Sequence, residues 1–162
     1  MRGVMLIYFQ TTLLTLNIRN KDFEIKTWDF LNQYFPNMFL HNKVVNVGSC
    51  DYIHRRFLDF HCIIDNILLC IDVDENQHKS YDDEAEISRK NDIMAVYTTP
   101  HIFIRFSPNG RYVSNNKTYN PILSNRLQVL KQNIDKTLDL IKTNKIYKSE
   151  NLLTEIYLFY DD

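Results

Sequence analysis

Apolar and polar positions along this chain follow two periods, one typical of helices and one typical of strands. Helical spacing predicts three helices, at residues 21–35, 80–96 and 121–141. Runs rich in β-branched and aromatic residues predict four strands, at residues 44–47, 57–64, 67–73 and 101–106. The apolar tail at 152–160 fits either a helix or a strand. This order predicts an α/β domain with a mixed sheet and helices on its faces.

The sharpest local prediction is a hairpin formed by residues 57–64 and 67–73. Asp65 and Asn66 separate the two runs and favour a two-residue turn. With such a turn, facing residues have numbers that sum to about 131, which places Asp59 opposite Asp72. The sequence therefore predicts two carboxylates as cross-strand neighbours.

Composition limits the class of protein. The chain has 162 residues, is 44% hydrophobic and contains only 4 prolines and 3 glycines, which excludes collagen-like and disordered chains. We expect one domain over residues 1–162, with its core at about 21–143 and with an N-terminal strand and a C-terminal tail as additions. The net charge of -1 excludes a uniformly basic nucleic-acid coater.

The N-terminal segment and the cysteines favour plain interpretations. Residues 1–18 carry one charge and could be misread as a secretory signal, but they lack a small-residue cleavage site, and the β-forming run at 4–9 predicts a strand. No stretch reaches the roughly 18 apolar residues that a membrane span needs. The three cysteines show no metal-binding spacing, which favours buried free thiols over a zinc site.

The charges are sorted along the chain. Residues 59–92 contain ten acids and three bases, whereas residues 105–148 contain nine bases and two acids. An acidic centre suits a divalent cation, and a basic segment suits a phosphate backbone. The alternative is that both segments are ordinary solvated surface.

The acidic centre lies where a buried strand ends. Asp72 and Asp74 are two apart on a predicted strand, so their side chains share one face. Two carboxylates beside a core repel each other unless a positive charge, most commonly a metal ion, lies between them. Asp59 is expected close enough to share that ion, and His78 follows after one short turn, where it could take a proton from water. The alternative for each residue singly is a strand-end or turn residue.

At these residues the chain resembles the PD-(D/E)XK nuclease superfamily, and within it the very-short-patch-repair-like endonucleases and their relatives in large DNA viruses. The first helix resembles a Glu-x-x-x-Trp-x-x-Leu pattern, with Glu24, Trp28 and Leu31. The other matching segments are 56–60, 71–78, 89–93 and 102–109. The resemblance implies a restriction-endonuclease-like fold, with a central mixed β-sheet flanked by helices.

The resemblance also implies a metal-dependent DNA endonuclease. Asp59 and Asp72, with Glu24 acting through water, would bind Mg²⁺, for which Mn²⁺ could substitute. Asp74 stands where the superfamily has a lysine, so the task of activating water passes to His78, whose ring a neighbour such as Asp74 or Glu75 would orient. Gln77 would position water or phosphate. The residues implied in contacts with DNA phosphates are Arg89, Arg105, Arg126 and Lys131.

Two other functional classes stay open. A domain that kept the fold and lost the chemistry would bind DNA or another partner without cutting it, and a Cys/His metalloprotein would hold zinc. The partner that the resemblance implies is DNA and not a membrane, and the apolar N-terminal strand and tail offer surfaces for a homodimer. We expect a protein that is not secreted and that acts in the cytoplasm, the nucleus or a viral factory of a host cell.

Overall fold

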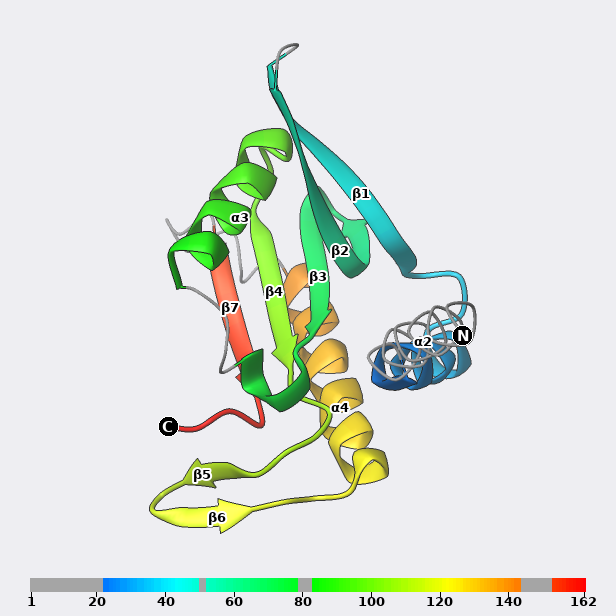
Figure 1. The fold of residues 1–162 in the computed structure, drawn as a ribbon. Helices are drawn as coiled ribbons and strands as arrows, with labels where there is room; N and C mark the ends of the chain where they lie inside the picture. Colours follow the sequence, from blue (N-terminus) through cyan, green and yellow to red (C-terminus); the bar gives the residue numbers. More distant parts are fainter. Residues whose placement is uncertain (1–21, 50–51, 79–82, 144–152) are drawn as a thin grey trace, which may run out of the picture.

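A computed structural model describes residues 22–49, 52–78, 83–143 and 153–162 (Figure 1). Within these ranges the description does not extend to the side chains of residues 43–49, 52–56, 78 and 83. The strand predicted at residues 4–9 lies outside the described residues.

Five strands form one mixed sheet in the order β1-β2-β3-β4-β7. The strands β1 (Leu40–Ser49), β2 (Tyr52–Ile64) and β3 (Ile67–Val73) are antiparallel neighbours, and β4 (His101–Phe106) and β7 (Leu153–Leu158) continue the sheet parallel to β3. The predicted mixed sheet is confirmed, and the ambiguous C-terminal tail is a strand.

Helices cover both faces of the sheet (Figure 1). The helices α2 (Asp22–Tyr34) and α4 (Leu123–Lys142) share one hydrophobic cluster with the sheet, and α3 (Asp83–Val96) packs on the opposite face. A short 3-10 helix, η1 (Glu75–His78), follows β3. No helix among the described residues is long and apolar enough to cross a membrane.

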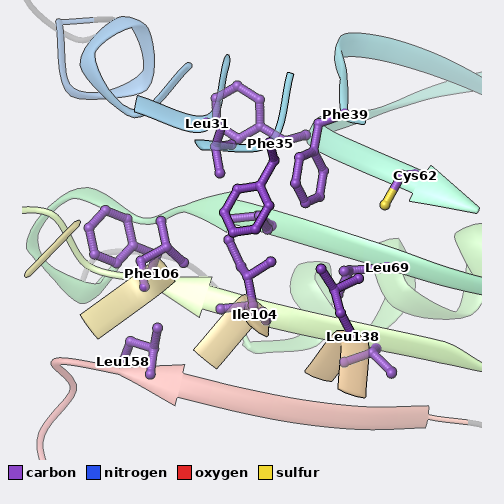
Figure 2. Packing of buried hydrophobic residues seen from close by; sticks show 14 of the residues in the cluster. Leu31, Phe35, Phe39, Cys62, Leu69, Ile104, Phe106, Leu138 and Leu158 are labelled. Atoms are coloured by element: carbon purple, nitrogen blue, oxygen red, sulfur yellow. The ribbon is translucent and has the colours of Figure 1, made fainter. Parts of the chain in front are cut away.

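The larger core lies between the sheet and the α2/α4 layer. Figure 2 shows Leu31 and Phe35 meeting side chains of the sheet such as Ile104 and Phe106, with Leu138 of α4 closing the cluster. The predicted stripe of α4 supplies buried residues at a spacing of three or four, which is what one buried helix face requires. Its buried apolar members are Leu127, Leu130, Ile134, Leu138 and Ile141.

The second core is smaller and lies beneath α3. Leu68, Cys70 and Phe103 of the sheet pack there against Ile93 of the helix. Cys62 belongs to the other cluster, so the two described cysteines are buried free thiols in different cores. This arrangement confirms the free-thiol interpretation for both and gives no support to a site in which they share zinc.

The predicted hairpin between β2 and β3 is confirmed, together with its register. Each strand pair from Ile64 opposite Ile67 to Phe60 opposite Ile71 has residue numbers that sum to 131. Asp65 and Asn66 have φ angles of 47° and 62°, the left-handed conformation that a type I′ turn requires at both central positions. The turn chemistry therefore fixes which residues face each other.

A second hairpin was not predicted from the sequence. The strands β5 (Tyr112–Ser114) and β6 (Lys117–Tyr119) form a separate two-stranded sheet. Asn115 and Asn116 form its turn with φ angles of 50° and 60°. The Asn-Asn pair between two β-forming stretches was the available signal, because asparagine tolerates the left-handed conformation.

The β2–β3 turn leads to a stability prediction. Asn66→Gly removes the Cβ from a residue with positive φ, and we expect the free energy of unfolding to rise by about 0.5 kcal/mol in urea denaturation, whereas Asn66→Ala lowers it by about 1 kcal/mol. Asn91→Gly, in the middle of α3, is the matched control and lowers stability by about 0.5–1 kcal/mol. A destabilised Asn66→Gly variant would contradict a type I′ turn.

Candidate functional site

Two carboxylates are buried at the end of β3. Asp72 is 2% exposed and Asp74 is 1% exposed, because β3 is the central strand and is covered on both faces. An unpaired charge in such a place costs several kcal/mol, so a folded chain must supply partners. The parallel register sets Arg105 of β4 opposite Asp72, which brings the first positive charge to this position.

Arg89 of α3 binds Asp72 through both of its terminal nitrogens. Nη1 donates to Oδ2 at 2.9 Å and Nη2 donates to Oδ1 at 3.0 Å, a bidentate geometry. Nη2 also donates to the carbonyl oxygen of Phe57 at 2.8 Å, and Nη1 donates to Glu86 at 3.3 Å. Burial alone would lower the pKa of Arg89, but Asp72 and Glu86 outweigh burial and raise that pKa.

Arg105 holds the second carboxylate. Its Nε donates to Oδ2 of Asp74 at 2.5 Å, and its Nη1 donates to Glu86. Tyr160, beyond β7, donates its hydroxyl to the same oxygen of Asp74. Burial and Asp74 raise the pKa of Tyr160, so this hydroxyl stays protonated and able to donate. Because Glu86 accepts from both Arg89 and Arg105, the ion pairs form one connected network.

Asp59 lies where the regular pattern of β2 is interrupted. Leu58 packs in the α3-side core, whereas Phe60, two residues later, packs in the other core. Residues two apart on a regular strand share one face. Because Leu58 and Phe60 lie on opposite faces, the alternation of side chains along β2 is broken at Asp59. The backbone N–H of Val73 donates to Oδ2 of Asp59 at 2.8 Å, so the carboxylate takes the place of a strand partner there.

The carboxylate of Asp59 is in an unfavourable electrostatic environment. The paired register of the hairpin ends at Phe60 opposite Ile71, one step before Asp59, so the pairing of Asp59 with Asp72 stays a prediction. Burial, followed by the charge of Asp72, raises the pKa of Asp59 to about 7, and Glu24 adds to this effect. Asp59 thus interacts electrostatically with the two other carboxylates that the sequence proposed as metal ligands, Asp72 and Glu24.

His41 is a residue near this site that the sequence did not reveal. Its Nε2 lies 2.6 Å from Oε1 of Glu24, and its ring stacks on Trp28 and on Phe60, with centroids 5.0 Å apart in each pair. The stack and the contact with His41 fix Glu24 relative to the start of β1. No spacing pattern could have identified His41, because its partners are set by the packing of α2 on the sheet.

Glu75 is a second residue that the sequence undervalued. Its Oε1 is buried and accepts no hydrogen bond from any residue that the structure describes. Burial, with Asp22 and Glu24 of α2, raises the pKa of Glu75. The signal was present in the sequence, because Glu75 directly follows Asp74 in the acidic motif.

The same motif also contains Gln77 and His78. The predicted role of Gln77 in positioning water or phosphate is not supported, because both ends of its amide hold other segments. Its Nε2 donates to the carbonyl oxygen of Arg111 at 2.9 Å, and its Oε1 accepts from the backbone N–H of Asp161 at 3.0 Å. The side chain of His78 lies outside the described part of the structure, so its role stays a prediction.

The predicted role of Arg126 in contacting DNA phosphates is not supported, because the side chain is buried and its guanidinium is occupied by backbone carbonyls. Its side chain is 0% exposed and stacks over the ring of Phe159, with the guanidinium carbon 5.0 Å from the ring centroid. The sequence misled because a cation on an amphipathic helix normally lies on the solvated face. Arg126 instead ties the loop before α4 to the helix by donating to the carbonyl oxygens of Ser107, Asn109, Gly110 and Pro121.

The other cations predicted to contact phosphate also have partners within the protein. Arg89 and Arg105 neutralise the carboxylates of the site itself. Lys131 donates to Asp135 at 2.6 Å and lies over the ring of Tyr34. A phosphate would have to compete with these contacts, so none of the three is a free phosphate-binding group.

The side chains around Asp59 are of the kind that bind a hard divalent cation. No group of three or more His, Cys, Asp or Glu side chains within the described ranges is arranged to hold a metal. The carboxylates of Glu24, Asp59 and Asp72 are nevertheless the ligands that Mg²⁺ prefers, and the buried oxygen of Glu75 lacks a donor. Arg89 already binds both oxygens of Asp72, so a metal ion at Asp72 would meet an occupied carboxylate.

The electrostatics of Asp59 predict a dependence of stability on pH. Because the pKa of Asp59 is raised from 3.8 to about 7 on folding, the folded state binds more protons between these values, and the free energy of unfolding falls as pH rises from about 4 to about 7. Asp59→Asn keeps an oxygen for the Val73 N–H and removes the charge. We expect it to be more stable than wild type by a few kcal/mol, on the order of 3, at pH 8 without divalent cations, with little difference at pH 4.

Urea denaturation in EDTA at both pH values measures this difference. The matched control is Asp29→Asn on the exposed side of α2, which should not reproduce the gain at pH 8. A less stable Asp59→Asn variant at pH 8 would show that the carboxylate is compensated in the folded protein.

No protein-family profile, no characterised protein and no solved structure matches this chain. The geometry of the site and the sequence motifs therefore carry the argument about function.

Proposed function

We propose that this chain is a Mg²⁺-dependent endonuclease that hydrolyses phosphodiester bonds in DNA, built on a restriction-endonuclease-like sheet. The observation that carries the proposal is the placement of Asp59 and Asp72 on adjacent strands, with the backbone N–H of Val73, the neighbour of Asp72, donating to the Asp59 carboxylate. Burial, together with the charge of Asp72, raises the pKa of Asp59. A cation bound between two buried carboxylates would relieve their repulsion, and carboxylate oxygens are the ligands that Mg²⁺ prefers. The resemblance of residues 71–78 to the PD-(D/E)XK motif supplies the reaction class.

In this proposal the side chains around the carboxylates have distinct tasks. Asp59 and Asp72 hold the metal, and Glu24, fixed by His41, reaches it through water. When bound, Mg²⁺ supplies a positive charge at the phosphate and a water of lowered pKa. His78 would be the residue that accepts a proton from the attacking water. Asp74 is held by Arg105 and Tyr160, so we assign it to fixing the end of β3 and not to the metal.

The β5–β6 hairpin is where we place the DNA backbone. Figure 1 shows it projecting beyond the C-terminal ends of β3 and β4, the edge that carries Asp72. Arg111 and Lys117 are exposed there, and the rings of Tyr112 and Tyr119 stack with centroids 5.4 Å apart. Exposed cations beside aromatic rings suit a nucleic acid. They replace the buried and paired cations that the sequence suggested.

A second candidate function is a domain of the same fold that binds DNA without cutting it. Two observations favour it. Asp74 stands in place of the superfamily lysine, and Arg89 holds the carboxylate that a metal would need.

Nicking of supercoiled plasmid DNA in the presence of Mg²⁺ separates the two functions. We expect the wild type to cleave, EDTA to abolish cleavage, and Asp59→Asn to lower the rate by roughly a hundredfold or more while DNA binding is retained. Asp29→Asn is the matched control and should cleave like the wild type. If the wild type binds duplex, mismatched or branched DNA but cleaves none of them with Mg²⁺ or Mn²⁺, the second candidate replaces the first.

A further inference from the structure

Arg89 occupies Asp72 in the way that a bound cation would. Its two terminal nitrogens take both carboxylate oxygens, at 2.9 and 3.0 Å. The side chains of Arg89 and Asp72 are 19% and 3% exposed, so water competes only weakly for this contact. Charge-assisted pairs in such surroundings are among the stronger polar contacts in proteins. A metal ion at Asp72 therefore has to compete with a group that is already present.

Arg89 also has partners that could retain it after a metal displaced it from Asp72. It donates to the carbonyl oxygen of Phe57 at 2.8 Å and to Glu86 at 3.3 Å. Glu86 is shared with Arg105, which independently neutralises Asp74. The guanidinium can thus give up one or both oxygens of Asp72 without becoming a buried charge that lacks a partner.

The charges around Asp72 do not balance, and the excess is negative. Arg89 and Arg105 face the carboxylates of Asp72, Asp74 and Glu86, so the network carries one negative charge in excess. Asp59 adds a second negative charge beside Asp72, and the contact that the structure gives to its carboxylate is a backbone N–H. A divalent ion placed between Asp59 and Asp72 would balance these two charges.

We propose that Arg89 is a built-in competitor of the metal ion at Asp72 and thereby sets the metal affinity of the site. The inference rests on the proposed function, because it takes Asp72 as a metal ligand. Metal entry frees N–H donors of Arg89 next to the metal, and such donors suit a phosphate oxygen. Arg89 therefore exchanges a carboxylate for the substrate, and metal loading prepares the phosphate site.

Calorimetric titration with Mn²⁺ or Mg²⁺ at pH 8 tests this exchange, and Arg89→Met removes the competitor while keeping an apolar chain of similar length. We expect its dissociation constant for the metal to fall roughly ten- to hundredfold, the range that corresponds to losing a hydrogen-bonded charge contact. Arg89→Lys keeps the charge but loses the bidentate geometry. We expect its dissociation constant for the metal to lie between those of the wild type and Arg89→Met. If Arg89→Met does not fold, Arg89→Lys alone decides the test.

Lys90→Met is the matched control, because it removes a positive charge from the neighbouring position of α3, where Lys90 pairs with Glu155 at 2.6 Å. Metal affinity in the Arg89 variants that is equal to or weaker than in Lys90→Met would overturn the inference and make Arg89 a support for Asp72. If the proposed function is wrong, the titration gives a different result: the dissociation constant for the metal is the same in Asp59→Asn as in the wild type. Failure of the inference alone leaves binding that depends on Asp59 and is indifferent to Arg89.

Discussion

Two carboxylates buried at the end of the central strand govern the arrangement of the residues around them. Asp72 and Asp74 are almost inaccessible, and an uncompensated charge at either position would cost much of the stability of a domain of this size. Arg89 from α3, Arg105 from β4 and the hydroxyl of Tyr160 from the C-terminal segment meet this requirement. Segments distant in sequence are thus tied to one strand end, and the proposed site is part of the framework of the fold.

The positive charges around the end of β3 do not balance all of its carboxylates, and the proposed metal site depends on this excess of negative charge. The described ion pairs do not include Asp59, and burial, together with the charge of Asp72, raises the pKa of Asp59 to about 7. Strained or repulsive groups of this kind are common at functional sites, where stability is lost in exchange for binding. His41 and the aromatic stack around it keep Glu24 next to the same region, which concentrates the unfavourable charge where a cation can relieve it.

Sequence reasoning succeeded where a local rule determines geometry. The Asp65-Asn66 turn determined the hairpin register as far as Phe60 opposite Ile71, which brings Asp59 to the end of β3 beside Val73. The apolar stripe of α4 determined the buried face of that helix. It failed where distant segments decide a side chain's environment. Arg126 lies on the buried stripe, three residues after Leu123 and four before Leu130, and its acceptors come from a loop that the sequence could not place. Gln77 is likewise held by the hairpin and the C-terminal segment.

Anomalous diffraction from crystals of the wild type soaked in Mn²⁺ tests the central claim, that Asp59 and Asp72 jointly hold a divalent cation, most directly. We expect a manganese peak between the two carboxylates, with the guanidinium of Arg89 withdrawn from at least one oxygen of Asp72. A soaked crystal with no peak at these carboxylates, and with Arg89 still on both oxygens, from a protein preparation that cleaves DNA in Mn²⁺, would contradict it.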